Sequence, residues 1–134
     1  MSELENYMTS EKQIQQLKYQ YMTYFKQNYS EIVEKKDFTS IDFLKAMNEM
    51  EKLNWKKFNH IGFINHRTEE CVQFIREGKN EWYADVPIIV NGEWDGYSWS
   101  AYSDNKTIAN MLRLFFEEVD WFGMLSWKMR RYKK

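Results

Sequence analysis

The dipeptide Asn91-Gly92 constrains the fold of this chain more than any other local feature. Both residues tolerate the positive φ angles of a two-residue hairpin turn, and such a turn follows the twist of the strands that it joins. Residues 82–90 precede it and residues 94–102 follow it, and both runs are rich in the aromatic and β-branched side chains typical of strands. The second run alternates aromatic and small polar residues, so one face of that strand would carry Tyr97, Trp99 and Ala101.

Two more segments complete a predicted four-stranded antiparallel meander. Residues 58–64 are too short for a helix and contain a central glycine, which favours a strand. Residues 71–75 form an apolar run that leads into the turn-forming residues 77–80. Pro87 lacks an amide donor, so the strand over residues 82–90 either lies at a sheet edge or carries a bulge at this position.

Helical spacing of apolar residues predicts helices on both sides of this meander. A capping box at Ser10-Glu11-Lys12-Gln13 begins a helix over about residues 11–35. A second helix begins near residues 39–42, and the short connection between the two helices predicts an antiparallel helical hairpin. Ser103-Asp104 caps a third helix, whose apolar face comprises Ile108, Met111, Leu112, Phe115 and Val119.

Residues 120–132 fit two patterns. Phe122, Leu125 and Met129 have helical spacing, whereas Trp121, Gly123, Leu125 and Trp127 alternate as in a strand. We favour a helical continuation that is broken near Gly123. The predicted fold is therefore a single α+β domain over residues 1–134, with an N-terminal helical hairpin, a four-stranded antiparallel meander, and a C-terminal helix or two packed on one sheet face. We expect residues 1–9 to fray and residues 128–134 to form a basic tail.

The composition indicates a cytoplasmic protein. The 134 residues include 43% hydrophobic and 29% charged side chains, and no apolar run approaches the roughly 18 residues that a membrane-spanning helix needs. The acidic and polar segment 1–6 does not resemble a secretory signal, and a single cysteine cannot form an internal disulfide. Fourteen lysines and ten asparagines against five arginines indicate an AT-rich bacterial or phage genome.

The net charge of −1 conceals an uneven distribution. Residues 67–120 contain eleven acidic and five basic side chains, together with the aromatic-rich strands, whereas residues 128–134 contain five basic ones. Aromatic anchors inside a charged rim are typical of protein-binding surfaces. The alternative is that the acidic side chains solvate the sheet while the aromatic ones fill its core. The predicted partner-binding residues are Glu81, Trp82, Asp85, Glu93, Trp94, Asp95 and Tyr97.

Trp82 and Tyr83 are central to this prediction because they are neighbours in a strand. Successive side chains of a strand point to opposite faces of the sheet, so at least one of these two rings would face away from the core. Trp94 lies beside the hairpin turn between two acidic residues, where complete burial is difficult.

The residue pattern predicts no catalytic, metal or cofactor site. Cys71 follows two glutamates in an apolar run, which fits a buried core residue better than a nucleophile. Together with His60 and His66 it matches no zinc-ligand spacing. Neither a calcium-binding loop nor a glycine-rich phosphate loop is present around the carboxylates Asp85, Glu93 and Asp95. The aromatic residues lie where phosphates would be repelled, which argues against direct nucleic-acid binding.

Together, these features predict a small cytoplasmic inhibitor of the immunity, antitoxin or anti-defence type. Its acidic, aromatic-rich surface would block a basic protein partner, such as a nuclease toxin or another nucleic-acid-binding protein, with no role for a membrane. The alternative is a small enzyme or ligand-binding domain with a pocket between helices and sheet, and a structural module is a third reading. An enclosed pocket lined by polar groups would favour the ligand-binding hypothesis, and a flat or convex acidic and aromatic surface would favour the inhibitor hypothesis.

Overall fold

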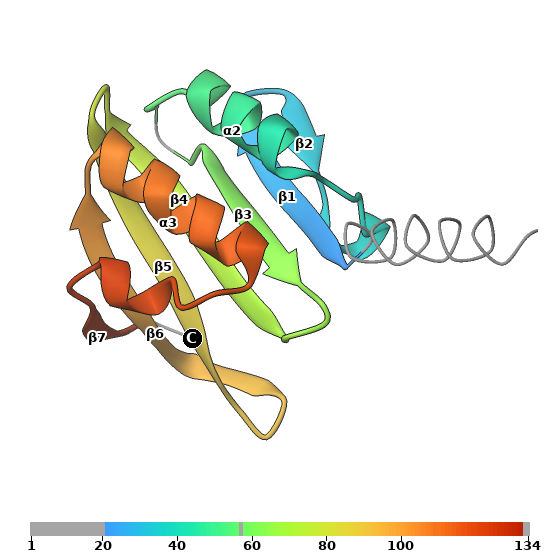
Figure 1. Cartoon of the computed structure of the whole chain (residues 1–134), viewed down its shortest axis with the longest axis vertical. Coiled ribbons are helices and arrows are strands. Elements are labelled where there is room, and N and C mark those ends of the chain that lie inside the picture. Colours follow the sequence, from blue (N-terminus) through green and yellow to red (C-terminus); the bar gives the residue numbers. More distant parts are fainter. Residues whose placement is uncertain (1–20, 57, 133–134) are drawn as a thin grey trace, which may run out of the picture.

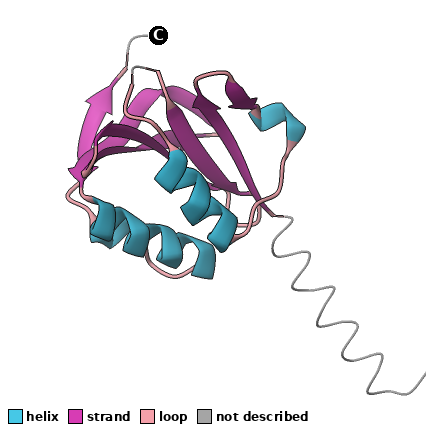
Figure 2. Ribbon diagram, turned by 90° about the horizontal axis from the view of Figure 1, so that it is seen from above, coloured by secondary structure: helices cyan, strands magenta, loops and turns pink. Residues whose placement is uncertain are grey.

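The computed structural model describes residues 21–56 and 58–132, which form one antiparallel sheet with two helices on one face (Figure 2). The seven strands of this part of the chain are β1 (Met22–Asn28), β2 (Glu31–Val33), β3 (His60–Asn65), β4 (Glu70–Gly78), β5 (Glu81–Val90), β6 (Glu93–Ser103) and β7 (Lys128–Arg131). Their spatial order is β2-β1-β3-β4-β5-β6-β7. The helices are α2 (Phe43–Lys52) and α3 (Asn105–Glu117), with 3-10 turns η1 (Lys35–Asp37) and η2 (Phe122–Met124).

The core lies between the sheet and the two helices. Alternate residues of the strands point toward the helices, and Phe63 of β3 and Phe74 of β4 are completely buried there with rings 6.2 Å apart. From α3, the buried face comprises Ile108, Met111, Leu112, Phe115 and Phe116. The apolar stripe predicted for the third helix therefore faces the core, except for Val119, which lies beyond the end of α3 and is exposed.

Both helices begin at the ends of the predicted starting segments, residues 39–42 and 103–104. The Asp42 carboxylate accepts a hydrogen bond of 2.8 Å from the Lys45 amide, and the Asp104 carboxylate accepts one of 2.8 Å from the Thr107 amide. Each bond satisfies an amide that has no partner inside its helix. The second and third predicted helices and the α+β class are thus confirmed.

The predicted N-terminal helical hairpin is wrong, because residues 22–33 form the β1–β2 hairpin and extend the sheet. The part of the expected helix over residues 11–20, with its capping box, and the expected frayed segment 1–9 lie outside the described residues. The misreading has a physical cause in β1, which is buried on both faces. Tyr24 faces the helices, while Phe25 packs on the other face against Gly62 of β3, where a Cβ atom would come within 2.0 Å of its ring. Consecutive buried residues of this kind mimic helical spacing.

The predicted helical continuation over residues 120–132 is also wrong. α3 ends where Glu118 adopts a left-handed conformation with φ of 60°, and its amide and that of Val119 close the last turn on Leu114. The chain then forms η2 and returns as β7, which pairs antiparallel with β6. Trp127 stacks on Phe122 with ring centroids 4.8 Å apart, which fixes the reversal. The sheet therefore has three strands more than the predicted four-stranded meander.

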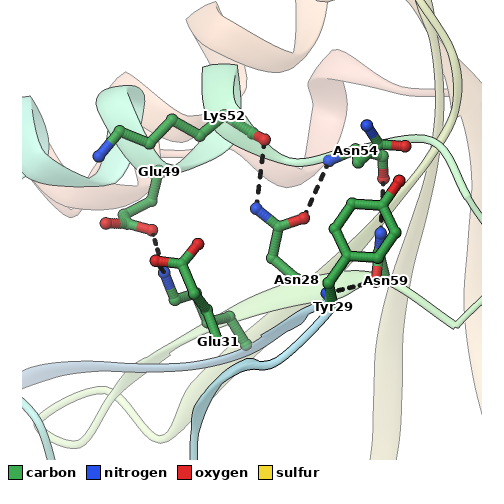
Figure 3. Close-up of polar contacts among 8 residues, drawn as sticks. Asn28, Tyr29, Glu31, Glu49, Lys52, Asn54 and Asn59 are labelled. Carbon is green, nitrogen blue, oxygen red and sulfur yellow. Dashed lines mark hydrogen bonds and ion pairs between the residues drawn. The ribbon is translucent and has the colours of Figure 1, made fainter.

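Polar side chains connect α2 to the strands beneath it (Figure 3). The Asn28 amide group donates to the Lys52 carbonyl oxygen and accepts from the Asn54 amide, both at 3.2 Å. Asn59 accepts a 3.0 Å hydrogen bond from the Tyr29 amide (Figure 3). These bonds hold the end of α2 and the chain leading into β3 against the turn between β1 and β2.

In the described part of the chain, neither helix combines the length and the apolar character needed to cross a membrane.

Candidate functional site

The β5–β6 hairpin extends beyond the rest of the sheet (Figure 1). The β4–β5 ladder runs from the Gly78–Glu81 pair to the Gln73–Asp85 pair, whereas the β5–β6 ladder continues to the Val90–Glu93 pair. Residues 86–97 therefore project beyond the paired part of β4, and we call this segment the arm. A projecting hairpin presents side chains from both faces to a partner.

The geometry of the arm follows from Pro87 and from the turn at its tip. The β5–β6 register shifts between Pro87 and Ile89, which confirms the predicted bulge. At the tip, Asn91 has φ of 51° and Gly92 has φ of 80°, which confirms the predicted two-residue hairpin turn. The β4–β5 ladder ends at Asp85, just before this bulge, and the turn joins β5 to β6 beyond it.

The arm exposes large apolar side chains. Ile89, Val90 and Trp94 are 51%, 57% and 47% exposed, respectively. Trp94 is nevertheless fixed, because its indole N–H donates a 2.8 Å hydrogen bond to the Tyr97 carbonyl oxygen and its ring lies 6.2 Å from that of Tyr132. A rigid and exposed tryptophan loses little conformational entropy when a partner covers it.

The structure gathers Glu93, Trp94, Asp95 and Tyr97 on the arm and separates the other predicted residues from them. Glu81 is exposed at the opposite end of β5. Trp82 is 3% exposed in the core, where its indole N–H donates a 2.6 Å hydrogen bond to Asn105. A buried ring of this kind packs the fold and is unavailable to a partner.

Tyr83 and Asp85 lie on the sheet face opposite the helices, so Trp82 and Tyr83 do point to opposite faces. There they belong to a chain of hydrogen bonds. Arg130 of β7 donates to the Tyr83 hydroxyl at 2.9 Å, and the hydroxyls of Tyr83 and Tyr132 are 2.6 Å apart. Tyr132 in turn donates to Asp85 at 2.9 Å, and Ser100 donates to the same carboxylate at 3.1 Å.

Burial dominates the electrostatics of this chain of hydrogen bonds. It raises the pKa of the Asp85 carboxyl above its usual value, although the Tyr132 and Ser100 hydroxyls and the charge of Arg130 act in the opposite direction. Burial also raises the pKa of the Tyr132 phenol. Both hydroxyls and the carboxylate are used within the protein, so we assign this cluster the role of fastening β7 to the sheet.

The basic C-terminal segment lies along the acidic half of the sheet. Arg131 is placed over the Tyr97 ring, with 5.8 Å between its guanidinium carbon and the ring centroid, and Lys128 pairs with Ser100 in the β6–β7 ladder. β7 thus brings three cations to the edge of β6, and the charge of one of them, Arg130, acts on Asp85 of β5. Residues 128–131 of the predicted basic tail form an edge strand, and residues 133–134 lie outside the described part.

On the side of the arm away from β7, two acidic side chains have no partner among the described residues. A groove of about 360 Å³ opens where β5 leaves β4, and Glu69 and Glu70 contribute to it from the turn before β4 and from its first residue. Apolar residues form the rest of its lining, among them Ile89, Trp99 and Phe122. Neither glutamate has an ion-pair or hydrogen-bond partner for its carboxylate among the described residues.

Glu69 and Glu70 are not among the partner-binding residues predicted from the sequence. Their position beside a groove depends on the divergence of β4 and β5, two strands that are adjacent along the chain. Pro87 was the available signal, because a residue without an amide donor ends the regular pairing of a strand.

Both histidines have hydrogen-bond partners within the fold, and the cysteine is a free thiol. His66 forms a 2.6 Å hydrogen bond with the Thr23 hydroxyl, and a ring nitrogen of His60 lies 3.0 Å from the Phe58 carbonyl oxygen. Burial raises the pKa of the Cys71 thiol to about 11, so the thiol stays protonated at neutral pH. Within the described residues, no three side chains of His, Cys, Asp or Glu come together as metal ligands.

No protein-family model, curated protein or solved structure matches this chain.

Proposed function

We propose that this chain is an inhibitory binding protein of the immunity or antitoxin kind, which uses the arm to block a basic protein partner in the cytoplasm. The observation that carries the proposal is the placement of a rigid, half-exposed Trp94 on a projecting hairpin, with Ile89 and Val90 exposed beside it. Glu93 on the arm and Glu69 and Glu70 next to it supply negative charge.

The two kinds of side chain have different roles in this proposal. Exposed carboxylates attract a basic partner over a distance of about a Debye length and so raise the association rate. Trp94 and its apolar neighbours are then desolvated in the contact and slow dissociation, as aromatic anchors do in protein interfaces. A nuclease or another nucleic-acid-binding enzyme has the basic surface that fits this mechanism.

A second candidate function follows from a groove of about 660 Å³ between α2 and α3, lined by Met47, Arg76, Trp82 and other residues. A pocket in this place would suit a small-molecule ligand. Two of the polar side chains in its lining already bond to other parts of the chain, however. Arg76 donates to the carbonyl oxygens of Glu51, Leu53 and Lys79, and Trp82 donates to Asn105. The arm therefore supports the stronger proposal.

Site-specific cross-linking tests the proposal in cells of the native host. A photoreactive phenylalanine analogue replaces Trp94 in one variant and Leu44 in a matched control, because Leu44 is 80% exposed on α2, away from the arm. We expect the Trp94 position to capture one protein of high isoelectric point that the Leu44 position does not capture. Equal capture from both positions, or capture of acidic proteins alone, would contradict the proposal.

Binding kinetics with the purified captured protein then test the mechanism. Trp94→Ala should accelerate dissociation, with a cost of about 2 kcal/mol or more in binding free energy. Glu93→Gln should slow association and reduce its dependence on salt. The captured protein should also lose its activity when the unmodified chain is added in equimolar amount. An unchanged dissociation rate for Trp94→Ala would exclude the arm as the anchor.

A further inference from the structure

We propose that the groove beside the arm binds a lysine or arginine side chain of the protein partner. This inference rests on the proposed function and assigns a specific subsite to it. The groove exists because β4 and β5 separate: Glu70, Cys71 and Val72 of β4 pair with β3, while the facing part of β5 has left the β4–β5 ladder.

The groove combines apolar and acidic side chains. Most of its lining is apolar, including the Trp99 and Phe122 rings in an edge-to-face arrangement 6.1 Å apart and Ile89 on the arm. Its two acidic lining residues are Glu69 and Glu70. Within the described chain, no lysine or arginine lines it.

A long basic side chain matches both kinds of lining residue. The methylene groups of lysine or arginine pack on apolar and aromatic surface while the charged end remains at the rim. There the cation would meet two carboxylates that have no partner among the described residues. A purely apolar side chain would leave the carboxylates unused, and an acidic one would be repelled by them.

Fixed backbone geometry supports a permanently formed subsite. Glu69 adopts a left-handed conformation with φ of 61°, in the turn where Asn65 accepts hydrogen bonds from the Arg67 and Thr68 amides at 2.9 and 3.2 Å. Arg67 forms an ion pair with Glu118, which fastens the same turn to the end of α3. The backbone that carries Glu69 and Glu70 is thus held next to the groove before a partner arrives.

Peptide titrations monitored by nuclear magnetic resonance test the inference on the full chain. The probes are the blocked tripeptides Ac-Gly-Lys-Gly-NH2 and Ac-Gly-Arg-Gly-NH2, with norleucine and glutamate peptides of the same length as controls. We expect both basic peptides to shift the amide signals of residues 69–71 and the indole signal of Trp99. The norleucine peptide, which keeps the stem and lacks the charge, should bind more weakly, and the glutamate peptide should leave these signals unchanged.

Two double variants with the same change in net charge separate the groove from general attraction. Glu69→Gln/Glu70→Gln should weaken the basic peptides by roughly fivefold, the scale expected for exposed ion pairs. Glu77→Gln/Glu81→Gln, which changes two exposed acids at the other end of β4 and β5, should not. Equal weakening by both variants, or no shifts at residues 69–71 up to the solubility limit of the peptides, would overturn the inference.

The outcome can be distinguished from that of the proposed function. The peptide titration does not involve Trp94, so its failure leaves the arm as the anchor for the partner. Conversely, peptide binding in the groove together with failed cross-linking at Trp94 would refute the arm and retain the subsite.

Discussion

Tyr132 donates a 2.9 Å hydrogen bond to Asp85 and so ties the end of the described chain to the middle of β5. The same hydroxyl is 2.6 Å from that of Tyr83, which accepts a hydrogen bond from Arg130. β7 is a four-residue edge strand with all its side chains exposed. The side-chain hydrogen bonds of Arg130 and Tyr132 to β5 are therefore a main source of its attachment.

Removal of the Tyr132 hydroxyl should therefore loosen β7. In Tyr132→Phe we expect the amides of residues 128–131 to exchange with solvent faster, while those of β3 and β4 keep their protection. Tyr102→Phe is the matched control, because the Tyr102 ring is 73% exposed on the same sheet face next to Tyr83. Hydrogen exchange measured by mass spectrometry distinguishes the two variants. Equal exchange of β7 in both would mean that the Tyr132 hydroxyl does not hold this strand.

Asp85 should make the stability of the protein depend on pH in an unusual direction. Burial raises its pKa in the folded state above the ordinary value of 3.8, so the folded protein binds a proton more tightly than the unfolded chain does. Stability is therefore lost as pH rises from the unfolded to the folded pKa, and it is regained on acidification.

Comparison with Asp85→Asn isolates this effect. Asparagine keeps an oxygen that accepts from Tyr132 and Ser100 but does not titrate in this range. As pH falls from 7 through the acidic range, the unfolding free energy of the unmodified chain should rise relative to that of the variant. Urea denaturation at a series of pH values measures the difference. If the unfolding free energy of the unmodified chain fell relative to that of Asp85→Asn, the Asp85 pKa would be lowered in the folded state instead.

The fold was predictable where neighbouring residues determine it. The strands around Asn91-Gly92 were located correctly because the turn chemistry is local, and the same holds for Asp104 at the start of α3. β1 was misassigned because its environment is not local. Phe25 is buried on the face away from the helices by Gly62 and by the Lys35 side chain, 4.5 Å from its ring, and this burial removes the alternation that identifies a strand.

The candidate site was predictable only in part, for the same reason. Alternation shows that Trp82 and Tyr83 point to opposite faces, but it does not show which face the helices cover. β7 also depends on a pairing between segments far apart in sequence, with Trp99 opposite Met129. Since β7 places cations beside β6, the acidic surface expected around residues 81–97 is smaller than the sequence suggests.

Gly92 should be required at the tip of the arm for its backbone conformation alone. Its φ is 80°, and an added Cβ atom would meet no other atom within 4 Å. Gly92→Val should therefore cost about 1–2 kcal/mol in the free energy of unfolding, because a β-branched residue disfavours this conformation. Gly92→Asn should cost less, since asparagine tolerates positive φ, and Gly78→Ala should be mild because its Cβ would make ordinary contacts at 3.6 Å. Equal stability of the Val and Asn variants in urea denaturation would contradict the turn assignment.

Loss of one partner of the ion pair between Lys26 of β1 and Glu49 of α2 should strongly lower the free energy of unfolding. Replacement of both partners by apolar residues should lower it much less. Their charged atoms are 2.6 Å apart, and the two side chains are only 8% and 10% exposed. Burial by itself would lower the pKa of the Lys26 ammonium, but the hydrogen bond and charge of Glu49, with a contribution from Glu31, outweigh it and raise the pKa above 10.5. Lys26 therefore contributes stability that is fully present below pH 10.5 and lost as pH rises through its higher folded-state pKa.

Glu49→Gln leaves a buried ammonium without its main counter-charge and should cost about 3–5 kcal/mol. Glu31→Gln is the matched control. Its carboxylate is 3.8 Å from the same ammonium but 66% exposed, so the expected cost is less than about 1 kcal/mol. The double variant Lys26→Met/Glu49→Leu should recover most of the loss, because two packed apolar side chains avoid the desolvation of both charges. Urea denaturation at pH 7 gives the three values. A double variant as unstable as Glu49→Gln would show that the ion pair itself, and not the unpaired charge, stabilises the contact between α2 and β1.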